Sequence, residues 1–174
     1  MATAEDRFTR IYEEHYDAVE RYVRRRADDA VVRDVVAEVF LVVWRRFDEV
    51  PSDPLPWLYG TARRVLANEL RGDRRRTQLV ARVAEHVSTE IDDHAEDVVG
   101  LVSMAAAMDR LSEPDQEALR LVAWEDLNLR EAARAAGCSM AAFAMRLHRA
   151  RSRLRQEMTW ATTNRLMALR GEPT

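Results

Sequence analysis

Apolar residues recur along the first half of the chain at intervals of three and four, the spacing that places them on one face of an α-helix. The first stretch consists of Phe8, Ile11, Tyr12, His15, Tyr16, Val19, Tyr22 and Val23. The second consists of Val32, Val35, Val36, Val39, Phe40, Val43, Trp44 and Phe47. Valine is common in strands, but the spacing, length and flanking charges of the second stretch favour a helix. No alternating strand pattern occurs anywhere, so the sequence predicts an all-α fold.

A proline-rich segment separates the second predicted helix from a third. Three prolines lie between positions 51 and 56, and proline lacks the amide hydrogen that a helix interior needs. The third helix is expected to begin near Pro56, because proline suits the first turn. It carries Trp57 and Tyr59 and ends in the basic run 71–76. Aromatic rings beside arginines suit melted nucleic acid, and the structural alternative is a buried Trp57 with solvated arginines.

The second half of the chain has the sequence pattern of a helix-turn-helix motif. A periodic segment around 102–111 is followed by Ser112, a proline and two acids, which together mark a helix start. Asn128, with a glutamate three residues later, resembles a capping box for a short helix that ends at Gly137. Ser139 is then placed to cap a longer, basic helix. A short helix, a tight turn and a longer helix form the order of a helix-turn-helix.

The longer helix, expected to run to about Glu157, has an apolar face and a cationic face. The apolar face consists of Phe143, Leu147, Ala150 and Leu154. The cationic face consists of Arg146, Arg149 and Arg153, with Arg151 and Arg155 beside them. Guanidinium groups held in this way can reach phosphates or guanine edges in the major groove of DNA. The structural alternative is a solvated arginine face.

The net charge of −3 is unevenly distributed between 27 arginines and 30 acidic residues. Residues 77–106 hold one arginine and six acids, whereas residues 107–174 hold 11 arginines and nine acids. This pattern predicts two folded pieces joined by an acidic linker. The predicted parts are a domain at 5–76, the linker at 77–104, a helix-turn-helix domain at 105–160 and a tail at 161–174 without an assigned role.

Several other classes of protein are excluded or disfavoured. The single cysteine, Cys138, excludes an internal disulfide and a cysteine-based zinc cluster. No apolar run approaches the roughly 18 residues of a membrane span, and the N-terminus is polar, so a cytoplasmic protein without membrane insertion is expected. The acids at 92–97 around His94 match no metal-site spacing. No metal, cofactor or catalytic residue is predicted.

Two groups of motifs together resemble the extracytoplasmic-function sigma factors of the sigma-70 family. The first group is Asp34-Val-Val-Ala-Glu-Val-Phe40, Trp57-Leu-Tyr-Gly-Thr-Ala-Arg63 and Arg74-Arg-Arg76. The second is Leu111-Ser-Glu-Pro-Asp-Gln-Glu-Ala-Leu119, Asp126-Leu-Asn-Leu-Arg-Glu-Ala-Ala133 and Arg146-Leu-His-Arg-Ala-Arg-Ser-Arg-Leu154. The resemblance covers roughly residues 5–76 and 105–157. It implies sigma domains two and four of a non-enzymatic subunit that directs bacterial RNA polymerase to promoters and helps to melt DNA.

The resemblance also implies partners and binding residues. The partners are core RNA polymerase and promoter DNA, and the sequence leaves open whether an anti-sigma factor binds. The residues implied in polymerase docking are Asp34, Glu38, Trp44, Arg45 and Arg46. Those implied at the minus-ten element are Ser52 and Asp53 in the proline-rich loop, then Arg64, Asn68, Arg71, Arg74, Arg75 and Arg76. Those implied at the minus-thirty-five element are Ser139, Ala142, Arg146, Arg149, Arg151 and Arg153. Among the last set, Arg146 and Arg149 are expected to read bases and Arg153 to hold a phosphate.

The sequence departs from the family pattern at several positions. Arg64 stands where asparagine is common, Asn68 where aspartate is common and Ala37 where glutamine is common. The recognition helix begins with Ala142-Phe-Ala144, whose small groups can touch thymine methyls but donate no hydrogen bonds.

Two alternatives for the function stay open. One is a helix-turn-helix regulator that acts without polymerase, which leaves the motifs of residues 1–76 unexplained. The other is a metal-dependent hydrolase that uses the acids at 92–97.

Overall fold

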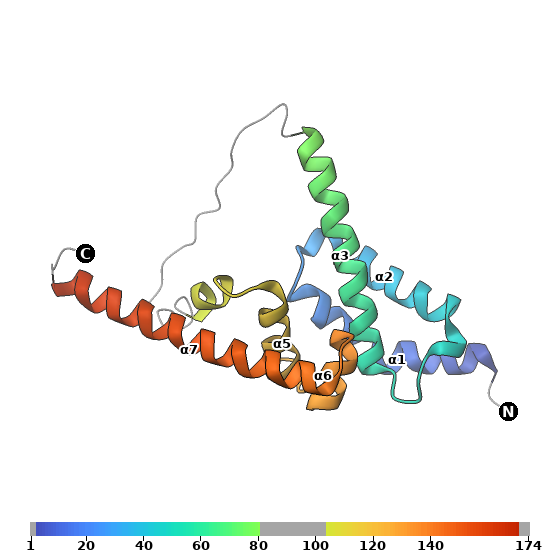
Figure 1. The fold of residues 1–174 in the computed structure, drawn as a ribbon. Helices are drawn as coiled ribbons and strands as arrows, with labels where there is room; N and C mark the ends of the chain where they lie inside the picture. Colours follow the sequence, from blue (N-terminus) through green and yellow to red (C-terminus); the bar gives the residue numbers. More distant parts are fainter. Residues whose placement is uncertain (1–2, 81–103, 171–174) are drawn as a thin grey trace. The chain divides into compact units, whose positions relative to one another are not determined.

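The computed structural model describes residues 3–80 and 104–170, and for residues 70, 72–80 and 161–170 it describes the backbone alone. Every regular element in these ranges is helical, so the predicted all-α fold is confirmed (Figure 1). The chain divides into two compact units, Met1–His86 and Val87–Thr174, and each is described by itself. No helix in the described ranges has the length and apolar character that a membrane crossing needs.

The first unit is a bundle of three helices. They are α1 (Ala4–Arg24), α2 (Asp29–Arg45) and α3 (Leu55–Val80), with a short 3-10 turn, η1 (Phe47–Glu49), after α2. Each helix packs against the other two. Val19 and Tyr22 of α1, Val36 and Val39 of α2 and Leu58 of α3 are fully buried in its core. The valine-rich stretch forms a helix because its valines fall on one face, where burial outweighs their weaker helix propensity.

The loop between η1 and α3 is tied to α1 at the start of the chain. The backbone N–H of Thr3 donates to Asp6 Oδ2, and the N–H of Asp6 donates to the Thr3 hydroxyl, which fixes the first turn of α1. Hydrogen bonds from the backbone and then the side chain of Thr3 lower the pKa of the Asp6 carboxyl. One turn later, Arg7 Nη2 donates to the Val50 carbonyl oxygen at 2.7 Å, and its guanidinium lies 4.9 Å from the centre of the Phe47 ring. Arg7 of α1 therefore anchors the start of the proline-rich loop.

In the second unit, short helices pack against the first half of one long helix. Residues 104–109 are helical, followed by α5 (Glu113–Ala123), α6 (Leu129–Ala136) and α7 (Met140–Arg170). Phe143 and Ala150 of α7, Leu121 of α5 and Ala132 of α6 are fully buried, and these contacts hold the three helices together.

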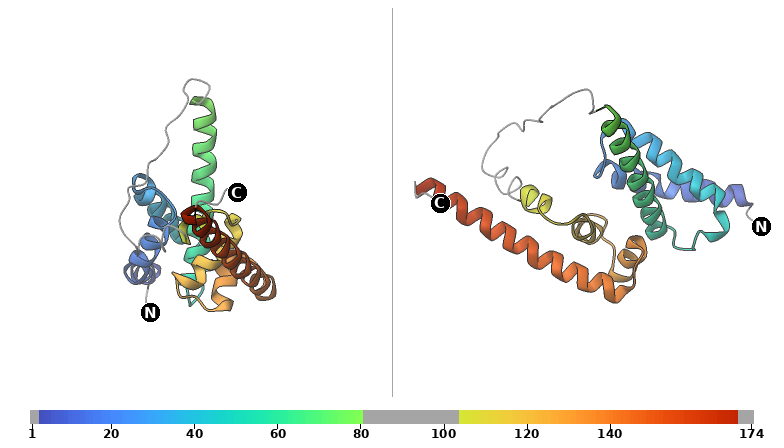
Figure 2. Two further views of the ribbon diagram at one scale, coloured as in Figure 1. Left: turned by 90° about the vertical axis from the view of Figure 1, so that its left-hand side faces the viewer. Right: turned by 45° about the horizontal axis from the view of Figure 1, so that its top comes forward.

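The length of α7 corrects one expectation. The sequence analysis ended this helix at about Glu157, but α7 continues through the predicted boundary at 160 to Arg170. The reason is that neither glycine nor proline occurs between positions 138 and 170, so nothing stops the helix. In the right view of Figure 2, α7 runs far past the short helices that pack on its first half. Most of the predicted tail therefore belongs to the same helix.

The predicted domain boundaries stay a prediction. Most of the predicted acidic linker, 77–104, lies outside the described residues, and α3 continues past the predicted domain end at 76 to Val80.

Candidate functional site

Helices α6 and α7 form a tight helix-turn-helix. Asn128 Oδ1 accepts a hydrogen bond from the N–H of Glu131 at 3.1 Å, and Glu131 Oε2 accepts one from the N–H of Asn128 at 2.9 Å. This reciprocal pair is the predicted capping box. Gly137 ends α6 in the left-handed conformation, with φ of 69°, which glycine adopts without a Cβ clash. Ser139 Oγ then accepts a hydrogen bond from the N–H of Ala142 at 3.2 Å and starts α7.

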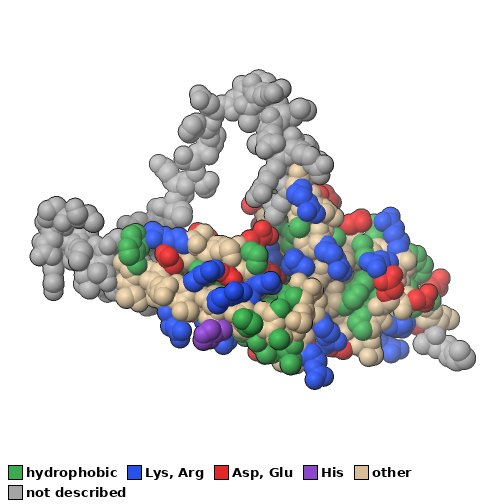
Figure 3. Space-filling model, viewed as in Figure 1, with side chains coloured by type: hydrophobic (Ala, Val, Ile, Leu, Met, Phe, Trp, Pro, Cys, Tyr) green, Lys and Arg blue, Asp and Glu red, His purple; other side chains and the backbone are tan. Residues whose placement is uncertain are grey.

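The first half of α7 has a buried face and an exposed face. Phe143, Leu147 and Ala150 are buried against the short helices. Successive residues of a helix are about 100° apart, so Met145 and Arg149 lie on the opposite side. Met145 is 64% exposed and Arg149 is exposed. Figure 3 shows basic side chains gathered along this part of the surface. A helix held by one face with a cationic face in solvent has the geometry that major-groove binding requires.

An ion pair joins α5 to α7 at the edge of this surface. Arg153 Nη1 donates to Asp115 Oδ2 at 2.5 Å. The Asp115 side chain is only 7% exposed, whereas that of Arg153 is 56% exposed. Because Asp115 is buried and the arginine covers it, part of the Arg153 guanidinium serves to hold α7 in place.

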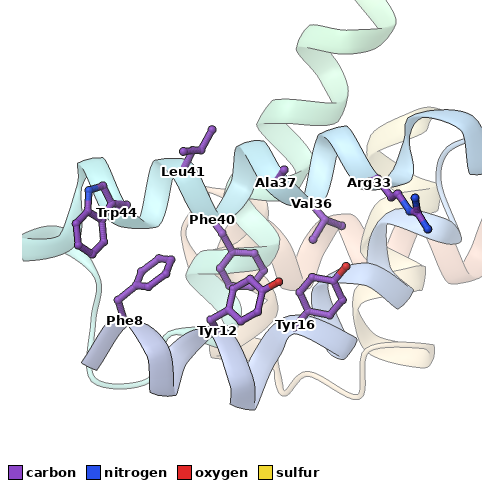
Figure 4. A pocket seen from close by; sticks show the side chains of 9 residues that line it. All are labelled: Phe8, Tyr12, Tyr16, Arg33, Val36, Ala37, Phe40, Leu41 and Trp44. Atoms are coloured by element: carbon purple, nitrogen blue, oxygen red, sulfur yellow. The ribbon is translucent and has the colours of Figure 1, made fainter. Parts of the chain in front are cut away.

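An aromatic groove of about 630 Å³ lies between α1 and α2 (Figure 4). Its lining consists of Phe8, Tyr12, Tyr16, Arg33, Val36, Ala37, Phe40, Leu41 and Trp44. The Phe8 and Trp44 rings meet edge to face at 5.2 Å, and the Tyr12 ring lies 4.8 Å from that of Phe40. Trp44 is nevertheless 49% exposed, and Tyr12 and Leu41 are also exposed. Such a gathering of exposed apolar groups is typical of a surface that binds another protein.

A second groove, of about 410 Å³, lies between α2 and α3 and has polar walls. Its lining consists of Glu38, Val42, Arg46, Thr61, Arg64, Val65, Asn68 and Glu69. Within this polar groove, Arg64 Nη2 donates to the Thr61 hydroxyl at 3.3 Å. Partial burial lowers the pKa of Arg64, and the positive charges of Arg46 and Arg63 lower it further.

Two sequence models of one protein family match the two units. The model of Sigma-70 region 2 matches residues 11–77, and that of Sigma-70, region 4 matches residues 101–154. The chain is a sigma factor of the sigma-70 family. Both regions occur where the motifs placed them, and in the same order. Sigma factors direct RNA polymerase to promoters and are not enzymes, so the predicted function is confirmed and the hydrolase alternative is rejected. The regulator alternative also fails, because it leaves the region 2 match unexplained.

Solved structures of two proteins share the fold of this sigma factor. The first is the sigma factor RpoE in complex with the anti-sigma factor NepR from Bartonella quintana, with a TM-score of 0.64 and 22% identity over 87% of this chain and 96% of that one. The second is CnrH in complex with the cytosolic domain of CnrY, with a TM-score of 0.57 and 21% identity over 86% of this chain and 85% of that one. The sequence has no match among curated proteins.

The residues predicted to bind the upstream promoter element lie on α7, but their settings differ. Arg146 is half-buried, and its Nη1 lies 4.0 Å from Cys138 Sγ in the turn. Arg153 is in the ion pair with α5. Arg149 and Arg151 are two positions apart, about 200° around the helix, so they cannot face the same base edges. The exposed members of the set are Ser139, Ala142, Arg149, Arg151 and Arg153.

The residues predicted to dock on polymerase divide between two surfaces. Asp34 is exposed, and its carboxylate has no ion-pair partner among the described residues. Trp44 lies in the aromatic groove, next to α1. Glu38 and Arg46 instead line the polar groove, although Glu38 Oε1 also lies 3.6 Å from Arg45 Nη1. Trp44 therefore lines one groove, and Glu38 and Arg46 line the other.

The residues predicted at the minus-ten element lie in the loop before α3 and along α3. Ser52 and Asp53 are exposed in the loop, and Arg64 and Asn68 line the polar groove. Arg71 is exposed, and its Nη2 donates to Asn68 Oδ1 at 2.5 Å. The backbone of residues 74–76 is part of α3, but the side chains of Arg74, Arg75 and Arg76 lie outside the described residues.

The two aromatic residues expected beside these arginines have different environments. Tyr59 is buried, with its ring stacked 4.7 Å from that of Tyr22, so it belongs to the core and cannot stack on a base. Trp57 is half-buried. The structural alternative named Trp57 as the buried residue, but the buried aromatic residue is Tyr59.

Sequence reasoning missed the exposed apolar residues of both units. Met140 and Met145 are exposed at the start of α7, and Tyr12 and Leu41 are exposed beside the aromatic groove. The exposure of Met145 could have been predicted from its position opposite the buried face of α7. Tyr12 gave no such signal, because its spacing places it on the apolar face of α1.

Proposed function

We propose that this sigma factor docks on core RNA polymerase through the exposed side of α2 and the adjoining aromatic groove, and that it reads the upstream promoter element with the first half of α7. The observation that carries the second proposal is the capped helix-turn-helix, whose longer helix is buried on one face and cationic on the other.

Docking through α2 is supported by large apolar side chains that this helix exposes to solvent. Leu41 and Trp44 are large apolar side chains in solvent on a helix whose buried face is already complete. Asp34 offers an unpaired carboxylate on the same helix. Apolar anchors beside a polar rim form the usual composition of a protein interface.

Base reading by α7 is supported by the side chains on its exposed face. Arg149 can donate two hydrogen bonds to a guanine, and Arg146 can do so from the flank of the helix. Met145 and Ala142 offer apolar groups that suit thymine methyls. We therefore propose an upstream element that contains both guanine and thymine at the contacted positions.

An anti-sigma factor is proposed as a third partner, and the cytoplasm as the location. The first proposal rests on the fold shared with RpoE, which was solved in complex with the anti-sigma factor NepR. The second rests on the family, because bacterial RNA polymerase acts on DNA in the cytoplasm.

The experiment is transcription in vitro with core polymerase on fragmented genomic DNA, with every transcript start mapped. We expect starts that share an upstream element and that require this protein. The Arg149→Ala variant should lose the selectivity of these starts, whereas Arg155→Ala removes an exposed arginine from another side of the same helix and should retain it. Equal selectivity in both variants would contradict the proposed reading face. Tight, specific binding to promoter duplex without polymerase would contradict the proposed dependence on docking.

A further inference from the structure

We propose that the aromatic groove between α1 and α2 binds a small apolar carboxylate of the fatty-acid type, and that the bound ligand blocks docking on core polymerase. In this arrangement the carboxylate pairs with Arg33, and the apolar chain lies along the aromatic rings. Ligand binding depends on the groove alone, whereas the block of docking rests on the proposed function, because it needs α2 to contact polymerase.

The groove lies between two lines of side chains that run along neighbouring helices. Each line has one side chain per helical turn. The line on α1 consists of Phe8, Tyr12 and Tyr16, and the line on α2 consists of Arg33, Ala37 and Leu41. Phe8 meets Trp44 at one end, and Arg33 lies at the other end, nearer Tyr16 than Phe8 (Figure 4). These ends are about 16 Å apart along α2 at 1.5 Å per residue, so an extended ligand fits the space.

The groove has the composition of a small-molecule site. Its volume is about 630 Å³, and sites for small ligands typically enclose roughly 300–1,000 Å³. Val36 and Phe40 are buried and form the floor, whereas Leu41 and Trp44 are exposed at the rim. Ala37 has the smallest side chain of the lining, and its methyl group leaves the wall of α2 open between its two neighbours in the line. A ligand chain that enters there replaces water on an apolar floor.

Three donor groups in the groove have no acceptor among the described residues. Arg33 is exposed, and no described residue forms an ion pair or a hydrogen bond with it. The acid one turn before it, Asp29, pairs with Arg24 at 2.7 Å instead. The hydroxyls of Tyr12 and Tyr16 likewise have no hydrogen-bond partner in the part of the chain that the structure describes. A carboxylate accepts hydrogen bonds from both guanidinium and phenol groups, so it suits this set of donors.

The charge of the groove favours a carboxylate over other head groups. Among the described residues that line the groove, Arg33 alone carries a charge, so the groove balances a single negative charge. A carboxylate carries one charge, whereas a phosphate monoester carries roughly 1.5–2 at neutral pH. A cation of the same shape would meet Arg33 without an acid in the lining to offset the repulsion.

The bound ligand would cover the side chains that we propose to contact polymerase. Leu41 and Trp44 are the large apolar residues that α2 exposes, and both line the groove. A ligand chain in the groove is stabilised by burying this same apolar surface. One surface cannot be buried against two partners at once, so the ligand and core polymerase exclude each other.

The first test compares two probes of opposite charge, laurate and dodecylammonium, which have the same chain length. Calorimetric titration of the full chain, below the concentrations at which the probes form micelles, should give one equivalent of bound laurate. Dodecylammonium should bind about tenfold more weakly, because it cannot form hydrogen bonds between charged groups with Arg33. Equal affinities for the two probes, or several equivalents of bound laurate, would overturn the proposal.

Two variants and a control test which residues set this preference. Arg33→Glu keeps the apolar walls and should reverse the order of the two affinities. Ala37→Leu keeps the charge but fills the wall of α2, and should lose laurate binding. Arg10→Glu reverses an exposed charge on α1 outside the groove and should change neither affinity. Circular dichroism checks that each variant keeps its helices, and an unchanged order of affinities in Arg33→Glu would overturn the proposal.

A brominated laurate locates the bound ligand. Bromine quenches tryptophan fluorescence at short range, and Trp44 lines the groove. Quenching should be lost in Trp44→Phe, which keeps an aromatic ring. It should be retained in Trp124→Phe, which removes an exposed tryptophan of the second unit. Quenching that persists in Trp44→Phe would place the ligand elsewhere and overturn the site.

The last measurement titrates core polymerase into the protein with and without laurate. Laurate should weaken the affinity of the wild-type protein for core and leave that of Arg33→Glu unchanged. One bound equivalent of laurate with unchanged core affinity would overturn the block of docking, and with it the proposed docking surface. Absence of laurate binding would overturn the ligand site and leave the proposed docking surface standing.

Discussion

Replacing Arg153 by alanine should destabilise the helix-turn-helix unit of this sigma factor by about 2 kcal/mol. The value follows from the surroundings of the ion pair. Leaving one member of a fully buried pair without its partner costs about 3–5 kcal/mol. Here only Asp115 is buried, at 7% exposure, and Arg153 is 56% exposed, so water can replace part of what the arginine supplies. For a unit of this size, about 2 kcal/mol corresponds to a fall in melting temperature of roughly 8–16 °C.

The assay is hydrogen exchange of the α5, α6 and α7 amides in the full chain. The two units need not unfold together, so a single melting curve does not define one free energy of unfolding. Arg153→Ala, Asp115→Ala and the double variant form a double-mutant cycle. We expect a coupling of about 1–2 kcal/mol between the two positions. If the losses of stability in the two single variants add up to the loss in the double variant, the ion pair does not hold α7 and the reasoning is wrong.

The same variants separate this role of Arg153 from the expected phosphate contact. If Arg153 only positions α7, Asp115→Ala should weaken DNA binding as much as Arg153→Ala, with no change in the salt dependence. If Arg153 also holds a phosphate, Arg153→Ala alone should flatten the slope of log affinity against log salt by about 0.9. The measurement is holoenzyme binding to promoter DNA at several salt concentrations, below the temperature at which either variant unfolds.

Five further substitutions test the two units. Asp34→Arg and Glu38→Arg should each weaken binding to core polymerase at unchanged helicity, because both reverse a charge on the polar side of α2. Titration of each variant with core polymerase measures this affinity. Arg146→Ala and Arg149→Ala should each cost about 1–3 kcal/mol of selectivity between native and scrambled upstream elements, and an equal loss on both DNAs would contradict a base-reading role. Asn128→Ala should cost about 1 kcal/mol by removing the capping box, and unchanged hydrogen exchange in α6 would refute that estimate.

The helices were predictable because burial imposes a period on the sequence. Phe143, Leu147 and Ala150 follow one another at intervals of four and three, and all are buried. The capping box of α6 was predictable for a different reason, since Asn128 and Glu131 interact across one turn and need no other part of the chain. Both signals are local, and local signals can be read directly from the order of residues.

The grooves and the ion pair could not be predicted in this way. Asp115 and Arg153 are 38 positions apart, and neither residue differs in its local sequence from a solvated one. The polar groove combines side chains from α2 and α3 that the sequence analysis had assigned to two separate partners, Arg46 to polymerase and Arg64 to DNA. Such combinations depend on how two helices cross, which no periodicity within one helix specifies.

The unbroken length of α7 has a mechanical consequence. Its 31 residues form a rod of about 46 Å, with the face that we propose to read bases at one end and no glycine or proline to act as a hinge. Such a rod is a lever arm: a tilt of about 5° at the DNA end displaces the far end by about 4 Å. The relation also works in reverse, so that a load applied to the last turns of α7 would exert a torque on the side chains that we propose to enter the major groove. The angle at which this helix would meet DNA can therefore be altered from a point several turns away from any base.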